Sequence, residues 1–142
     1  MKTEPITVRN LGNHTPQEVF DYIVSHLLKQ GKRSYGAYPD DTRTEGCLYR
    51  GPDNLKCAAG CLIPDDLYSK ELEGDSWGSV SRKLNCHENH AYLISQLQKA
   101  HDAAGDGPDG FECLIDRLRS LAEKSGLNTQ VIDRWEASQT QP

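Results

Sequence analysis

Three of the five cysteines lie in one short stretch, CLYRGPDNLKCAAGCLIPDDLY, residues 47–68. Cysteine can ligate zinc or act as a nucleophile, and in both roles it reacts as the thiolate. The neighbours of Cys57 and Cys61 are Ala, Gly and Leu, and apolar surroundings favour the protonated thiol. We therefore predict that these two thiols fill space in a buried corner, where small residues allow close approach of the backbone.

A zinc site is an alternative for the same cysteines. Its four ligands would be Cys57, Cys61, His87 and His90. Three residues separate the two cysteines, whereas regular zinc pairs are separated by two. The two histidines are three residues apart at a predicted helix start, a spacing that also suits ordinary surface side chains. We expect no cofactor, and zinc remains the alternative.

A small hydrolase is the second alternative. In it Cys57 is the nucleophile with His101 and Asp102 as partners, or Cys57 and Cys61 act with His90 and His101, by cysteine or metal chemistry. His90 and His101 are eleven residues apart, about three helical turns, so they share one helical stripe. The competing interpretation is structural: His101 is half-buried and bonds a loop, while Asp102 holds the following GDGPDG turn.

Composition and motif searches exclude several classes of protein. The net charge is -5 and no segment is a basic arm, so we expect no binding to nucleic acid through phosphates. The phosphate-binding pattern GxxxxGK[ST] is absent. Residues 105–110, GDGPDG, match the letters of GxGxxG, and residues 74–78, GDSWG, match those of GxSxG, but each follows a predicted helix instead of the strand that these motifs require. No stretch has signal-peptide character or the apolar length of a membrane span. We expect a cytoplasmic protein whose cysteines are reduced.

Periodicity predicts one mainly helical domain of 142 residues. The clearest helix follows Thr15 as N-cap, with Pro16 at its first position, Glu18 completing a capping box and Gly31 at its end. Further helices are predicted near 65–72, after Ser76, from Asn85 to about residue 103, and from Asp109 to Gly126. A last turn or two follows Asn128, and residues 137–142 form a loose tail.

The β structure is predicted to be a hairpin. Its strands are Cys47–Arg50 and Leu55–Ala58, joined by a Gly-Pro-Asp-Asn turn, and residues 5–9 could add an edge strand. In this register Cys47 and Cys57 point to opposite faces. The expected fold is therefore α+β, with a hairpin packed on helices.

Residues 31–46 show no periodicity, and they are predicted to form a long surface loop. Its tyrosines and basic residues suit a partner surface, and a functionless insertion is the alternative. The hairpin edge offers two more basic residues that guard it against aggregation. The candidate binding residues are Lys32, Arg33, Tyr35, Tyr38, Arg50 and Lys56.

The chain resembles a group of small uncharacterised proteins of bacteriophages and bacterial genomes. They share a pattern like Lys-Cys-Ala-x-Gly-x-Leu-Ile-Pro-Asp, then Glu-Gly, then Leu-Gln-x-x-His-Asp. In this chain the pattern falls on Lys56, Cys57, Ala58, Gly60, Leu62, Ile63, Pro64 and Asp65, then on Glu73 and Gly74, then on Leu97, Gln98, His101 and Asp102. The resemblance covers roughly residues 15–135.

The resemblance implies a setting rather than a reaction. It suggests a phage or prophage accessory protein that acts in the bacterial cytoplasm. Such proteins often bind host proteins, including those of defence systems. We expect a non-catalytic module, a monomer or a small homo-oligomer, that binds a host bacterial protein and neither nucleic acid nor a membrane.

Overall fold

The computed structural model describes residues 5–39 and 41–139 of the chain. The helices are α1 (Pro16–Gln30), α2 (Trp77–Lys83), α3 (Ala91–Ala103), α4 (Gly107–Ser125) and α5 (Gln130–Gln139), and the strands are β1 (Tyr35–Tyr38) and β2 (Asp41–Cys47). The mainly helical α+β class is confirmed. Within the described residues, none of the helices combines the length and apolar character needed to span a bilayer.

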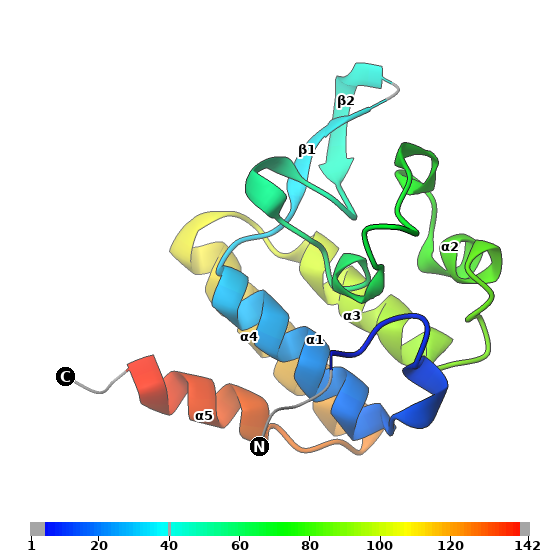
Figure 1. Ribbon diagram of the computed structural model, residues 1–142. Helices are drawn as coiled ribbons and strands as arrows, with labels where there is room; N and C mark the ends of the chain where they lie inside the picture. The colour runs from blue at the N-terminus through cyan, green and yellow to red at the C-terminus, as the bar shows by residue number, and fades with distance from the viewer. Residues whose placement is uncertain (1–4, 40, 140–142) are drawn as a thin grey trace.

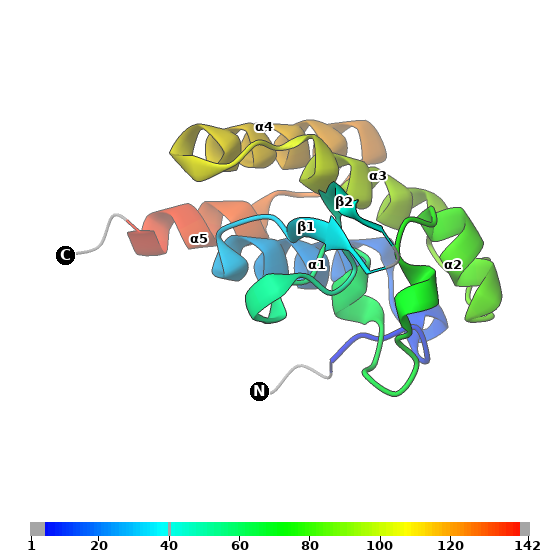
Figure 2. The same cartoon turned by 90° about the horizontal axis from the view of Figure 1, so that it is seen from above.

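The helices form one body around α3 (Figure 1). Helix α3 contacts α1, α2 and α4, and α5 packs on α1. Buried apolar side chains from all five helices join in a single core. Figure 2 looks down on the hairpin and shows β1 and β2 lying over α1 and α3. The hairpin therefore stands on one side of a helical body with a continuous core.

Helix α1 begins and ends as predicted. The Glu18 N–H donates to Thr15 Oγ1 at 3.2 Å, and the Thr15 N–H donates to Glu18 Oε1 at 2.8 Å. Gly31 ends the helix in the left-handed conformation, with φ at +76°. The predicted apolar face is buried: Val19, Phe20, Ile23, Val24, Leu27 and Leu28.

Helix α4 also ends as predicted, and α5 is longer than predicted. The Leu127 N–H donates to the Ala122 carbonyl at 2.9 Å, next to a left-handed Gly126. Helix α5 then runs for ten residues, because Ile132 is fully buried and the Trp135 ring packs on Phe111, with the ring centroids 5.2 Å apart and the planes tilted by 54°. Residues 137–139 of the predicted loose tail belong to this helix, and the remainder of that tail lies outside the described residues.

Two predicted helices differ from the structure. Helix α3 starts at Ala91, six residues after the predicted cap, because Asn85 and His90 have left-handed φ angles of +60° and +61°. Such angles interrupt a right-handed helix. The helix predicted near 65–72 is a turn followed by one 3₁₀ turn, Lys70–Leu72. The short helix after Ser76 is confirmed as α2, and the Ser76 hydroxyl accepts from the Ser79 N–H.

The hairpin was predicted in the wrong segment. Strands β1 and β2 occupy the region predicted to be a long loop, 31–46, and pair Tyr35 with Cys47 and Ala37 with Glu45. The sheet has only these two strands among the described residues. Tyr and Thr favour strands, and Pro39 lies at the turn, but the glycines Gly36 and Gly46 obscured the pattern.

The predicted strands at Cys47–Arg50 and Leu55–Ala58 are instead largely irregular because side chains satisfy their backbone. The N–H groups of Tyr49 and Arg50 donate to the Glu73 carboxylate at 2.8 and 3.0 Å. The Lys56 N–H donates to Gln30 Oε1 at 2.9 Å. Residues 5–9 form no strand either, and the Val8 N–H donates to the Leu62 carbonyl. These partners replace the bonds of a β ladder.

The close corner predicted at Gly60 is confirmed. A Cβ added there would lie 2.4 Å from the Tyr49 carbonyl oxygen, which is backbone and cannot rotate away. Gly60→Ala is expected to destabilise the fold by about 1–3 kcal/mol, because the two segments must separate. Urea unfolding followed by circular dichroism measures the change.

Gly78→Ala is the matched control for this substitution. Gly78 lies inside α2, and an added Cβ would meet only the Ser76 hydroxyl, at 3.7 Å. This variant is expected to be neutral or more stable by up to about 1 kcal/mol, since Ala is the better helix former. Equal unfolding midpoints for the two variants would contradict the close contact at Gly60.

Candidate functional site

A cleft of about 440 Å³ lies between the hairpin and the helical body. The hairpin and Arg33, two residues before β1, supply one wall. The start of α2 with the segment before it, together with α3, supplies the other. Its lining residues are Arg33, Tyr35, Tyr38, Gly46, Cys47, Tyr49, Cys57, Gly74, Asp75, Ser76, Trp77, Gln98 and Asp102. This volume is typical of small-ligand sites.

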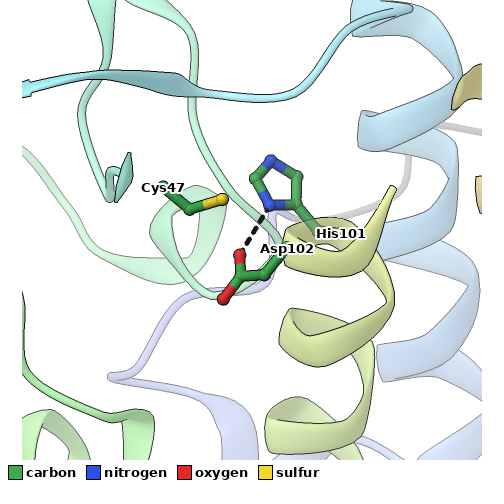
Figure 3. A group of neighbouring side chains, drawn as sticks. All are labelled: Cys47, His101 and Asp102. Carbon is green, nitrogen blue, oxygen red and sulfur yellow. Dashed lines mark hydrogen bonds and ion pairs between the residues drawn. The ribbon is translucent and has the colours of Figure 1, made fainter. Parts of the chain in front are cut away.

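Cys47, His101 and Asp102 meet beside this cleft. Their ligand-type atoms lie within 4.8 Å of one another, the only such group of three among the residues described. Figure 3 shows the Cys47 sulfur pointing toward the adjacent histidine and aspartate at the end of α3. His101 is 1% exposed, whereas the Asp102 side chain is 43% exposed. The group therefore reaches the cleft through Asp102 and Cys47.

Hydrogen bonds fix the protonation of the His101 ring. The buried Ser34 N–H donates to His101 Nε2 at 3.0 Å, so this nitrogen carries no proton. The neutral ring must then be protonated at Nδ1. Nδ1 lies 2.9 Å from Asp102 Oδ1 and donates to it. Both ring nitrogens are occupied, and neither is available to accept a proton from Cys47.

Asp102 is an acceptor held in place by two donors. His101 Nδ1 and Gln98 Nε2 both donate to Oδ1, at 2.9 and 2.8 Å. The Cys47 sulfur lies within 4.8 Å of the ligand atoms of His101 and Asp102. Gln98 is itself oriented, because its Oε1 accepts the Ala59 N–H at 2.9 Å. The carboxylate is thus positioned at the cleft by its neighbours on α3.

The environment keeps Cys47 protonated. Burial, and then the negative charge of Asp102, raise the pKa of the Cys47 thiol from 9.0 to about 12, although Arg33 acts in the opposite direction. A thiol of this pKa is almost entirely uncharged at neutral pH, and nucleophilic catalysis needs the thiolate. Because both ring nitrogens of His101 are also hydrogen-bonded, the geometry does not favour a cysteine hydrolase at this group.

The same bonds argue against zinc at this group. A metal bound at His101 Nδ1 would displace the ring proton to Nε2, where it would face the Ser34 N–H at 3.0 Å. Two donors would then oppose each other in a buried place, which is costly. The cluster is therefore better suited to accept N–H groups through Asp102 than to coordinate a metal through the imidazole.

Cys57 and Cys61 lie in the tight corner as space-filling thiols. The Cys57 sulfur accepts the Gly60 N–H at 3.3 Å, and the Cys61 thiol donates to the Ala58 carbonyl at 3.1 Å. Burial raises the pKa of the Cys57 thiol far above its usual value and that of Cys61 to about 12. Cys57 reaches the cleft wall that Asp102 also lines.

The histidines named with these cysteines lie elsewhere. His87 bonds to Ser81 and Arg82 near α2, and His90 bonds to the His14 carbonyl at 2.8 Å. Together with Cys57 and Cys61 they do not form a ligand group within the described part of the chain. Of the residues named for the hydrolase, the structure brings together His101 and Asp102, and joins them to Cys47.

The candidate binding residues of 31–46 divide between the surface and the cleft. Lys32 is exposed. Arg33, Tyr35 and Tyr38 are only partly exposed and line the cleft. The Arg33 guanidinium lies 4.1 Å from the Tyr35 ring centroid and forms an ion pair with Asp106. The tyrosines predicted to be exposed therefore face inward in part, because the hairpin folds over the helices.

Arg50 and Lys56 hold the irregular segment instead of guarding an edge. Arg50 Nη1 donates to the Gly60 carbonyl at 2.8 Å and Nη2 to the Ile63 carbonyl at 2.5 Å. Asp65 pairs with the same guanidinium. The Lys56 carbonyl accepts from the side chain of Gln30 at 2.9 Å. Arg50 thus serves mainly to satisfy backbone carbonyls in the corner.

The sequence pattern missed most of the cleft. Cys47, Gln98, Tyr49 and Trp77 were not proposed as site residues, since the hairpin was expected in another segment. Two local signals pointed to the cleft: the adjacent His-Asp pair followed by a glycine-rich turn, and the tyrosines and Arg33 of residues 31–46. The other lining residues come from distant segments, and only the fold brings them together.

Comparison of the chain with protein-family models, with curated proteins and with solved structures gave no match. The site is therefore interpreted from its own geometry.

Cys47 is expected to alkylate slowly with iodoacetamide. With a thiol pKa near 12, about one molecule in ten thousand is thiolate at pH 8, against about one in ten for an unshifted thiol. Asp102→Asn removes a negative charge, lowers the pKa of the Cys47 thiol and should speed its alkylation several-fold. Mass spectrometry of peptides after timed quenching measures the rate.

Arg33→Gln is the control of opposite sign. Loss of this positive charge raises the pKa of the Cys47 thiol further, so alkylation should slow. The alkylation rate of Cys113 on α4, measured in the same samples, corrects for differences in reagent concentration. Equal rates at Cys47 in all three proteins would contradict the electrostatic coupling of these groups.

Proposed function

We propose that the protein is a non-catalytic accessory module, of phage or prophage type, that binds a host protein in the bacterial cytoplasm through its hairpin. The observation that carries this proposal is the position of β1 and β2, which project from the helical body (Figure 1). A two-stranded hairpin contributes little stability alone, so its presence beside a continuous helical core suits recognition.

The hairpin has the features of a recognition element. Strand β1 pairs with β2 on one side only, within the described chain, and an unpaired strand edge can accept a partner strand. Ala37 and Glu45, which are paired across the hairpin, are both exposed. A partner could therefore meet backbone and side chains of the same element.

The base of the hairpin is rigid, which favours binding with little loss of freedom. The Leu48 N–H donates to the Ser34 carbonyl at 2.9 Å, and the Ser34 N–H is bonded to His101. The ion pair of Arg33 with Asp106 ties the entry of β1 to the start of α4. These anchors hold the hairpin on the helical body.

Site-specific photocrosslinking tests the hairpin as the contact surface. A photoreactive benzoylphenylalanine at Ala37, in cells that hold the protein at natural levels, is expected to yield one predominant adduct with a host protein. Mass spectrometry identifies the adduct, and titration of the purified host protein then measures the affinity. Binding should fall at least tenfold when Ala37 is replaced by aspartate.

The matched control places the same photoreactive group at Tyr92. This residue is 75% exposed and lies in the first turn of α3, roughly 15 Å along the helix from the hairpin end. No adduct with that host protein is expected from this position. Adducts from Tyr92 and none from Ala37 would show that another face of the molecule makes the contact.

A further inference from the structure

The charges around the cleft leave Asp102 without a cation. Of the three charged lining residues, Arg33 is paired with Asp106 at 2.9 Å and Asp75 with Lys83 at 2.7 Å. The neighbour of Asp102 is His101, which is neutral because Nε2 accepts the Ser34 N–H. The cleft therefore has one carboxylate whose charge no described group balances.

The field of this carboxylate acts throughout the cleft. Beyond the effect of burial, Asp102 raises the pKa of Tyr38, Tyr49 and Cys57 as well as that of Cys47. These four residues line the cleft from different segments. A negative potential in a partly enclosed space repels phosphates and carboxylates and attracts cations.

The hydrogen-bonding capacity of Asp102 points the same way. A carboxylate has about four acceptor positions, and His101 and Gln98 supply two donors, both to Oδ1. Acceptor capacity therefore remains for a ligand, on a side chain that is 43% exposed. The ligand group must be a donor, so a nitrogen cation satisfies both the charge and the free acceptor position.

The walls of the cleft also suit an organic cation. Tyr35, Tyr38, Tyr49 and Trp77 contribute four aromatic rings to the lining. Aromatic faces attract guanidinium and ammonium groups, and Arg33 over Tyr35 is an example within this molecule.

We propose that the cleft receives an arginine or lysine side chain of the bound protein, with Asp102 as its acceptor and the tyrosines beside it. This inference rests on the proposed function, because it names the chemistry of the segment that binds. The partner segment would cross the hairpin and insert one basic residue between β2 and α3.

Nitrogen-15 NMR with small probes tests the cleft without any partner. Nα-acetyl-arginine amide is expected to shift the amide signals of residues around the cleft, among them Gly46, Gly74 and Asp102, with a dissociation constant in the millimolar range. The citrulline analogue has the same shape without the charge, and it should bind at least tenfold more weakly. This comparison needs no variant.

Two variants locate the acceptor. Asp102→Asn should weaken binding of the arginine probe at least tenfold. Asp116→Asn, on an exposed position of α4, makes the same change in net charge and should leave binding within twofold.

A third variant tests the wall of the cleft. In Gly46→Ala, the new Cβ would lie 2.1 Å from the Tyr38 hydroxyl, so the ring must move. Its altered cleft should also weaken binding.

Three results would overturn the cation site: no shifts with the arginine probe at tens of millimolar, equal shifts with citrulline, or stronger cleft shifts with phenyl phosphate. Failure here is distinguishable from failure of the hairpin contact. If crosslinking at Ala37 succeeds while the probe does not bind, the partner uses the outer hairpin alone. If the probe binds while Ala37 gives no adduct, the cleft is a site for a small cation.

Discussion

The hydrogen bond from the Ser34 N–H to His101 Nε2 connects the hairpin to the helical body, and much else depends on it. Both groups are buried, so neither can form a hydrogen bond with water instead. The bond fixes the imidazole tautomer, and the tautomer aims a proton at Asp102. That carboxylate adds negative charge to the cleft and, after burial, contributes to the raised pKa of the Cys47 thiol. One backbone donor thus helps both to anchor the hairpin and to orient the charged group of the cleft.

The same principle holds the irregular chain between the hairpin and α2. Buried backbone outside helices and strands still needs partners, and here distant side chains supply them. Glu73 accepts from the N–H groups of Tyr49 and Arg50, and Gln98 accepts from Ala59. Several polar residues of the sequence pattern described above have this structural role, among them Glu73, Gln98 and His101. Such a pattern can describe a fold without describing a reaction.

Features specified by neighbouring residues could be predicted, and features that depend on distant partners could not. Helix α1 has its cap, its stop and its apolar face within one segment, and each is where the sequence predicted. The hairpin was expected after residue 46 because a turn composition is visible there, yet Glu73 satisfies that backbone and no ladder forms. His101 and Asp102 were visible as a pair. Their meeting with Cys47 depends on the fold of the hairpin, which no local pattern specified.

The anchors of the hairpin described above lie at its base, at Arg33, Ser34 and Leu48. Substitution or a change of length farther out along the strands would leave these anchors and the helical core intact. Changes there are expected to cost the fold little free energy. The architecture therefore separates a hydrogen-bonded support, on which folding depends, from a tip whose residues can be replaced with little effect on the core.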